Sequence, residues 1–113
     1  MQILLQKISL RELESMAAIM FEDMVKAVVD VDRELVALDA ELHSDLEALL
    51  LENGSKQANL WGINLYPQVS GDDFIEFDSM INVRPSGGNR SRGVENEPVR
   101  KKIIEVVTKW IHR

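Results

Sequence analysis

The chain of 113 residues has no cysteine, only two histidines and few aromatic side chains. The lack of cysteine excludes a disulfide framework, a thiolate metal site and a cysteine nucleophile. The serines form no GxSxG motif, and a serine triad would have to use His43, because His112 lies at the C-terminal end. The common nucleophilic hydrolases are therefore disfavoured, and the sequence identifies no cofactor.

Long apolar runs are also missing. Runs such as "LEALLL" are too short to cross a bilayer. The N-terminal "MQILLQKISLRELE" has no basic region before its short apolar stretch, unlike a secretory signal. We expect no membrane association and predict a cytoplasmic location.

The composition is that of a globular protein, with 45% hydrophobic and 28% charged residues. The length fits a single domain over residues 1–113. The net charge of −6 hides a split: residues 1–82 carry 16 acidic and 5 basic side chains, and residues 83–113 carry 3 acidic and 8 basic ones. Because the chain as a whole is acidic and offers few aromatic platforms, we expect no nucleic-acid partner.

Hydrophobic periodicity predicts eight elements in the order β-α-β-β-α-β-β-α. Helices are predicted after Ser9, Ser44 and Asn96, the first two with a capping box formed with Glu12 and Glu47. The first helix should end near residue 22 and the second near residue 54. Strands are predicted at 2–7, 25–31, 34–41, 60–66 and 73–84, with the second and third forming a hairpin.

This order predicts an α+β domain with a mostly antiparallel sheet of about five strands and all three helices packed on one face. We expect the core to combine helix stripes with one face of the sheet. Its predicted members are Leu13, Phe21, Val29, Leu49, Ile63, Phe77, Ile81, Ile103 and Trp110.

The other face of the predicted sheet is polar, because apolar and polar residues alternate along its strands. That face is either simply hydrated, as is common for antiparallel sheets, or it forms part of a binding surface. Its predicted side chains are Lys26, Asp30, Asp32, Asn64, Tyr66, Glu76, Asp78, Asn82 and Arg84.

The stretch "DAELHSD" offers a candidate metal site. Asp39, Glu41 and His43 fall at alternate positions, so an extended strand would project all three from one face. A helix capped at Ser44 would instead rotate His43 away, leaving it as a histidine at the helix entry. Both readings remain open, and Asp45 is explained by the helix dipole.

The segment "INVRPSGGNRSRG" is the candidate anion site. Gly87 and Gly88 can turn backbone amides toward an oxyanion, while arginines, an asparagine and a serine can bind its oxygens. No Walker or dinucleotide motif is present. The alternative is a soluble connection, with the arginines paired to nearby carboxylates. The predicted ligand residues are Arg84, Asn89, Arg90, Ser91 and Arg92.

The segments "ELHSD", "GSKQANLWGINLYP" and "INVRPSGGNRSR" resemble a family of small prokaryotic proteins known as a domain of unknown function. The resemblance covers nearly the whole chain. It implies a one-domain prokaryotic protein. The family has no assigned activity, so no catalytic or ligand residue can be carried over from it.

Two functions from different classes follow. The first is a non-catalytic binding module whose arginine loop receives an anionic small molecule or an acidic segment of a protein. The second is a metal-assisted phosphohydrolase, in which carboxylates and His43 hold a metal while the arginines stabilise phosphoryl charge. Apolar strands at 25–31 and 60–66 would be open edges if unpaired, which predicts a symmetric homodimer.

Overall fold

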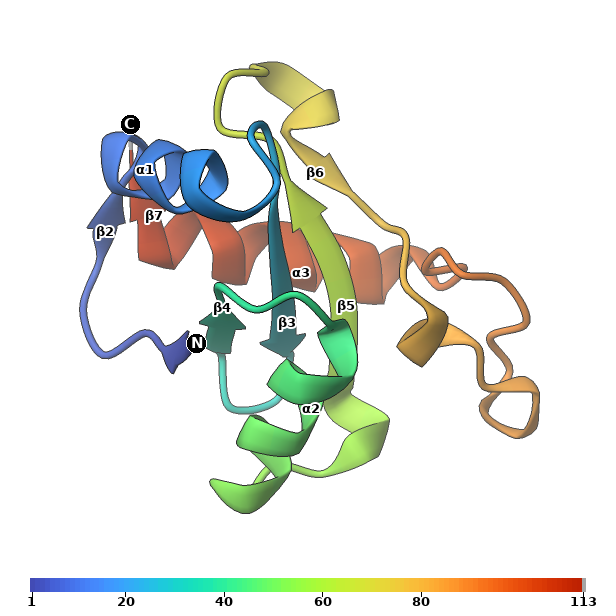
Figure 1. The fold of residues 1–113 in the computed structure, drawn as a ribbon. Helices are drawn as coiled ribbons and strands as arrows, with labels where there is room; N and C mark the ends of the chain where they lie inside the picture. Colours follow the sequence, from blue (N-terminus) through green and yellow to red (C-terminus); the bar gives the residue numbers. More distant parts are fainter. Residues whose placement is uncertain (113) are drawn as a thin grey trace.

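The computed structural model describes residues 1–112 and confirms an α+β fold (Figure 1). An antiparallel sheet contains, in spatial order, β1 (Gln2–Ile3), β4 (Leu35–Leu38), β3 (Val25–Asp30), β5 (Leu60–Leu65) and β6 (Ile75–Glu76). A second, parallel pair joins β2 (Ile8–Ser9) to β7 (Ile111–His112). The helices are α1 (Leu10–Met20), α2 (His43–Glu52) and α3 (Glu97–Trp110). Among residues 1–112, no helix is both long and apolar enough to span a bilayer.

Two of the three predicted helix starts are confirmed. Ser9 and Glu12 form the reciprocal capping box of α1, and the Asn96 side chain accepts from the Val99 amide at the start of α3. The box predicted at Ser44 is wrong: α2 starts two residues earlier, with Leu42 as its N-cap and no side-chain cap. The first turn of α2 therefore keeps amide groups that no side chain of the cap satisfies.

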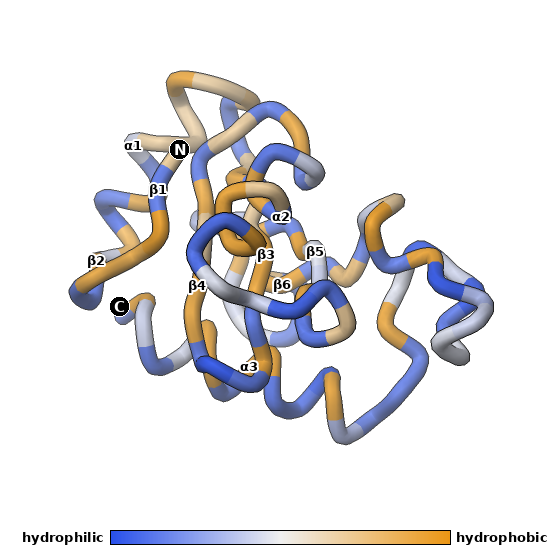
Figure 2. Tube along the Cα trace, turned by 90° about the horizontal axis from the view of Figure 1, so that it is seen from below, coloured by the Kyte–Doolittle hydropathy of each residue, from blue (hydrophilic) through white to orange (hydrophobic). Residues whose placement is uncertain are grey.

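The helices do not all cover one face, so that part of the fold prediction is wrong. Figure 2 shows α2 and α3 on opposite sides of β3 and β4. The larger apolar cluster includes residues of α1 and α3, whereas α2 packs Leu46 and Leu50 onto Val28 and Leu60 in a second cluster. The reason is that β3 and β5 are apolar on both faces, as central strands often are.

The long strand predicted at 73–84 is also wrong. Only Ile75 and Glu76 pair with β5, and Met80–Asn82 forms a 3₁₀ turn. Beyond β6, the Asn82 side chain bonds the backbone of Gly62 in β5, donating to its carbonyl at 3.0 Å and accepting from its amide at 2.8 Å. A side chain thus replaces the main-chain ladder, and the predicted face alternation fails after residue 78.

The predicted core is confirmed in part. Leu13, Val29, Ile63 and Ile103 are fully buried. The remaining five members are only partly buried, because they lie at the margins of the two clusters or outside them. These are Phe21, Leu49, Phe77, Ile81 and Trp110.

The strands at 25–31 and 60–66 are interior strands, not edges. The edges are β1 and β6, which have only two residues each. Short edge strands offer little main chain for pairing with a second copy. The homodimer therefore stays a prediction without an open apolar strand to support it.

Candidate functional site

The loop after β6 is built around Asn89, whose side chain is 4% exposed. Its Nδ2 donates to three carbonyl oxygens, those of Asn82, Ser91 and Gly93, and its Oδ1 accepts from the Glu95 amide. These bonds close the loop on itself. Asn89, predicted as a ligand residue, thus serves the internal structure of the loop.

Arg84 is also committed to the fold. Its guanidinium donates to the carbonyl oxygens of Ile81, Ala58 and Leu60, and it stacks 4.4 Å from the centre of the Trp61 ring. Burial lowers the pKa of Arg84 from its ordinary value. The Arg84 side chain packs against the start of β5, and its donors are used by carbonyl oxygens of the protein.

The turned amides of the loop do hold an anion, and it is the chain's own Glu95. Its Oε2 accepts from the amides of Arg90 at 2.7 Å and Ser91 at 2.8 Å. These hydrogen bonds lower the pKa of Glu95. Gly88, with φ of 88°, supplies the left-handed turn that precedes them. The internal carboxylate occupies the place proposed for an external oxyanion.

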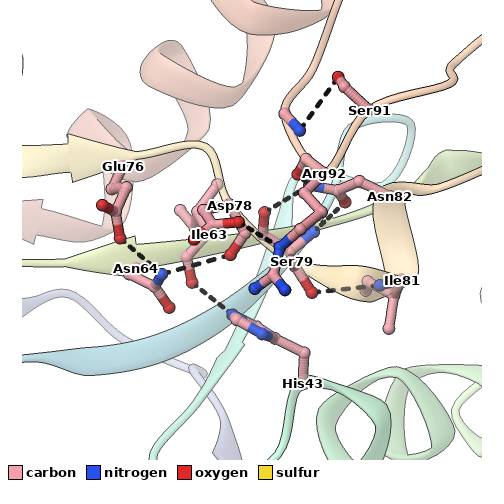
Figure 3. A network of polar contacts seen from close by, with 12 residues as sticks. His43, Ile63, Asn64, Glu76, Asp78, Ser79, Ile81, Asn82, Ser91 and Arg92 are labelled. Atoms are coloured by element: carbon pink, nitrogen blue, oxygen red, sulfur yellow. Dashed lines mark hydrogen bonds and ion pairs between the residues drawn. The ribbon is translucent and has the colours of Figure 1, made fainter.

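The side chain of Arg92 extends from the loop to Asp78. Its Nε lies 2.6 Å from Asp78 Oδ1, and its side chain is 56% exposed. Figure 3 shows the guanidinium of Arg92 and the ring of His43 pointing toward the same space. Asp78 therefore orients an arginine whose remaining guanidinium nitrogens face outward.

His43 is the first residue of α2 and is 9% exposed. Its Nε2 lies 2.8 Å from the Ile63 carbonyl oxygen, which requires that Nε2 carries the proton and donates. Burial lowers the pKa of His43, and the positive charges of Lys26 and Arg92 add to this effect. The bond to Ile63 and the charge of Asp78 oppose it.

The structure does not assemble the metal site proposed from Asp39, Glu41 and His43. Asp39 follows β4 with φ of 73°, Glu41 is exposed, and His43 turns inward to β5. Within residues 1–112, no group of three or more histidine, aspartate or glutamate side chains could hold a metal ion. The phosphohydrolase hypothesis therefore lacks the cluster it needs.

A cleft lies where β3, the start of α2, the 3₁₀ turn at Met80–Asn82 and Arg92 meet. It has a volume of about 170 Å³. We call it the Lys26–Arg92 cleft. Its lining residues are Lys26, Leu42, His43, Ser44, Ser79, Met80, Ile81 and Arg92.

Lys26 enters this cleft from the middle of the sheet. It lies opposite Asn64 in the β3–β5 register, so both side chains stand on the same face. The Asn64 Nδ2 donates to Glu76 and to the Asp78 carbonyl, while its Oδ1 is buried without a hydrogen-bond partner in residues 1–112. The ammonium group of Lys26 lies over the Phe21 ring, with its Nζ 5.2 Å from the ring centre.

Sequence reasoning identified two cleft residues as site candidates, Arg92 and His43, and it assigned them to different sites. It placed Lys26 only on a generally polar face and missed Ser79. A lone lysine in the β-branched run "VKAVVDV" was the available signal for Lys26. No local pattern indicates that Lys26, His43, Ser79 and Arg92 meet, because consecutive members of this set are 13 to 36 positions apart in the chain.

The buried His43 predicts a pH dependence of stability. Because the folded-state pKa is lowered, neutral His43 favours folding above its ordinary pKa of 6.5, and this contribution is lost as the pH falls below that value. We expect His43→Gln, which keeps a donor for Ile63, to lose less stability than wild type between pH 7 and pH 5.5. Urea denaturation at several pH values across this range measures how the free energy of unfolding changes with pH.

The matched control is His112→Gln, which changes an exposed histidine. This variant should keep the wild-type pH dependence. Parallel slopes for wild type and His43→Gln would contradict a buried neutral His43.

Comparison with known proteins gives one match. Residues 2–110 match the model of a family described as "Protein of unknown function (DUF5674)". No curated protein and no solved structure matches the chain. The family description carries no activity, so the geometry of the cleft carries the functional argument.

Proposed function

We propose that this chain, which belongs to the family DUF5674, is a non-catalytic binding module. In this proposal it holds an anionic group in the Lys26–Arg92 cleft. The proposal keeps the anion-binding class predicted from the sequence. It moves the site from the arginine loop to the cleft, since Glu95 occupies the loop amides. Of the predicted ligand residues, Arg92 alone lines the cleft.

The observation that carries the proposal is the convergence of positive charge in a chain of net charge −6. Lys26 and Arg92 line one small cleft together with His43. The positive charges of both residues lower the pKa of His43. Two cations held near each other repel unless an anion compensates them. Asp78 compensates Arg92. Within residues 1–112 Lys26 forms no salt bridge with a carboxylate, and its Nζ lies 5.2 Å from the centre of the Phe21 ring, a contact that leaves its charge uncompensated.

The start of α2 adds to this positive field. Its N-cap Leu42 provides no side-chain acceptor, and the first-turn residues His43 and Ser44 line the cleft. First-turn amides without a side-chain cap and the positive end of the helix dipole favour an anion at this position. The hydroxyl groups of Ser44 and Ser79 can bind further oxygens of the same group.

The cleft offers binding rather than catalysis. His43 uses its Nε2 proton to hold Ile63, and Asp78 is paired with Arg92. The two groups that could move a proton are thus engaged in bonds that position the cleft. The chemistry supported by these residues is charge-assisted hydrogen bonding to an oxyanion.

We expect Arg92→Gln and Lys26→Gln each to weaken binding of inorganic phosphate or acetate about tenfold, because each removes a charged hydrogen-bond donor worth about 1.5 kcal/mol. Titration of the isotope-labelled protein, followed at the amide resonances of His43 and Ser44, measures the affinity. Loss of one exposed ion pair should change stability by at most about 1 kcal/mol.

Arg90→Gln is the matched control, because it removes the same charge from an exposed arginine that does not line the cleft. It should change the affinity by less than about twofold, as expected for a screened distant charge. An equal loss in all three variants would show general charge attraction. The proposal would be overturned if neither phosphate nor acetate shifted the His43 and Ser44 resonances.

A further inference from the structure

The mouth of the Lys26–Arg92 cleft is apolar. Leu42 is 54% exposed and Met80 is 65% exposed, and both line the cleft beside the basic residues. Contiguous exposed apolar surface bordered by polar residues is typical of interaction sites. A ligand that only carried charge would leave these two side chains without a partner.

The size of the cleft limits what enters it. A volume of about 170 Å³ is smaller than the roughly 300 to 1,000 Å³ of pockets that enclose drug-sized ligands. One carboxylate or phosphate group fits inside, and the remainder of its molecule must lie across the mouth. The mouth, with Leu42 and Met80, therefore contacts whatever is attached to the anionic group.

The positions of the donors suit a planar carboxylate. Asp78 binds the Nε edge of Arg92, and the outward Nη atoms form the fork that pairs with two oxygens in one plane. Lys26, on β3, lines the cleft as a point charge, and the first-turn residues His43 and Ser44 of α2 line it as well. Charge complementarity thus calls for one acidic group.

We infer that the cleft binds an acidic segment of a partner protein, in which one aspartate or glutamate is flanked by apolar side chains. This inference rests on the proposed function. The carboxylate enters between Lys26 and Arg92, and the flanking apolar side chains cover Leu42 and Met80. The acidic group orients the bound segment. The apolar contacts give the cleft a higher affinity for such a segment than for free anions or phosphate-bearing metabolites.

The test compares three blocked pentapeptides with inorganic phosphate. The probes are acetyl-Gly-Leu-Asp-Leu-Gly-amide, its Ala-Asp-Ala analogue and its Leu-Asn-Leu analogue. We expect the Leu-Asp-Leu peptide to bind about tenfold more tightly than either analogue, the discrimination typical of a small apolar contact or a charged hydrogen bond. Shifts at the His43 and Ser44 amides locate the binding.

Variants of the mouth test the same point within the protein. Met80→Gln and Leu42→Gln should remove most of the preference for leucine and lower phosphate affinity far less, whereas Ile19→Gln, at an 86% exposed position on α1, should keep both. Glutamine is used at position 42 because a serine there would cap α2 and occupy its amides.

The outcomes separate the two proposals. Phosphate binding at His43 and Ser44 with equal affinities for the Leu-Asp-Leu and Ala-Asp-Ala peptides would overturn the inference and keep the proposed function. The absence of any shift with phosphate or peptide would overturn both. A Leu-Asn-Leu peptide that binds as tightly as Leu-Asp-Leu would show that charge has no part in recognition at this surface.

Discussion

Replacing Asn82 by alanine is expected to lower the free energy of unfolding by about 3 to 5 kcal/mol, since the buried amide and carbonyl of Gly62 each lose a partner worth about 1 to 3 kcal/mol and the Arg92 carbonyl loses one of its two donors. Asn82 is fully buried and bonds the amide and carbonyl of Gly62 and the Arg92 carbonyl. The same change should release the segment that positions Arg92 and Ser79 at the cleft.

Urea denaturation measures the loss, and Asn53→Ala is the control. Asn53 is exposed and accepts one bond from Arg33, so its removal should cost less than about 1 kcal/mol. We also expect Asn82→Ala to shift the amide resonances of residues 77–94 while those of α3 stay in place. Equal losses for the two variants would refute the role assigned to Asn82.

Gly62→Ala is expected to destabilise the fold by about 3 kcal/mol through overpacking. A Cβ atom at this position would lie 2.5 Å from the Cβ and 2.6 Å from the Oγ of Ser79. Ser79 cannot simply retreat, because its amide is bonded to the Arg92 carbonyl at 2.9 Å. The added methyl group must therefore push the 3₁₀ turn away from β5 and open the floor of the cleft.

Two further variants isolate this contact. Gly87→Ala is the matched control, since its Cβ would meet its nearest atom at 3.6 Å, and it should cost less than about 1 kcal/mol. Adding Ser79→Gly to Gly62→Ala should recover part of the loss, which a double-mutant cycle reports as coupling. Strict additivity of the two changes would contradict the predicted clash.

Turn and cap signals predicted the elements well where the relevant contacts are local. The box of Ser9 and Glu12 spans three positions, and the Asn96 cap does the same, so neighbouring residues decide both helix starts. The start of α2 was predicted wrongly, because burial of His43 against Ile63 competes with capping by Ser44. A contact 20 positions away determined that helix end.

The candidate site was less predictable than the fold. The sequence indicated a cluster of arginines at residues 84–92, and it identified internal pairing with the nearby carboxylates as the alternative to an external anion. Those carboxylates were Glu76, Asp78, Glu95 and Glu97. Arg92 pairs with Asp78, whereas Glu95 accepts from the backbone amides of Arg90 and Ser91 and not from a guanidinium group. Which arginine remains at a surface depends on where β5 ends and on which carbonyls surround Arg84, and neither property is a local pattern.

By itself, the sequence determined the α+β class, the hairpin of β3 and β4 and the caps of α1 and α3, because periodicity and capping act within a few residues. Only the tertiary structure decided that α2 lies opposite α3, that Asn82 takes the place of a strand and that Lys26 meets Arg92. Those outcomes depend on apolar burial on both faces of β3 and on hydrogen bonds between segments far apart in the chain. Such contacts form only when the chain closes on itself, and no spacing along the sequence records them.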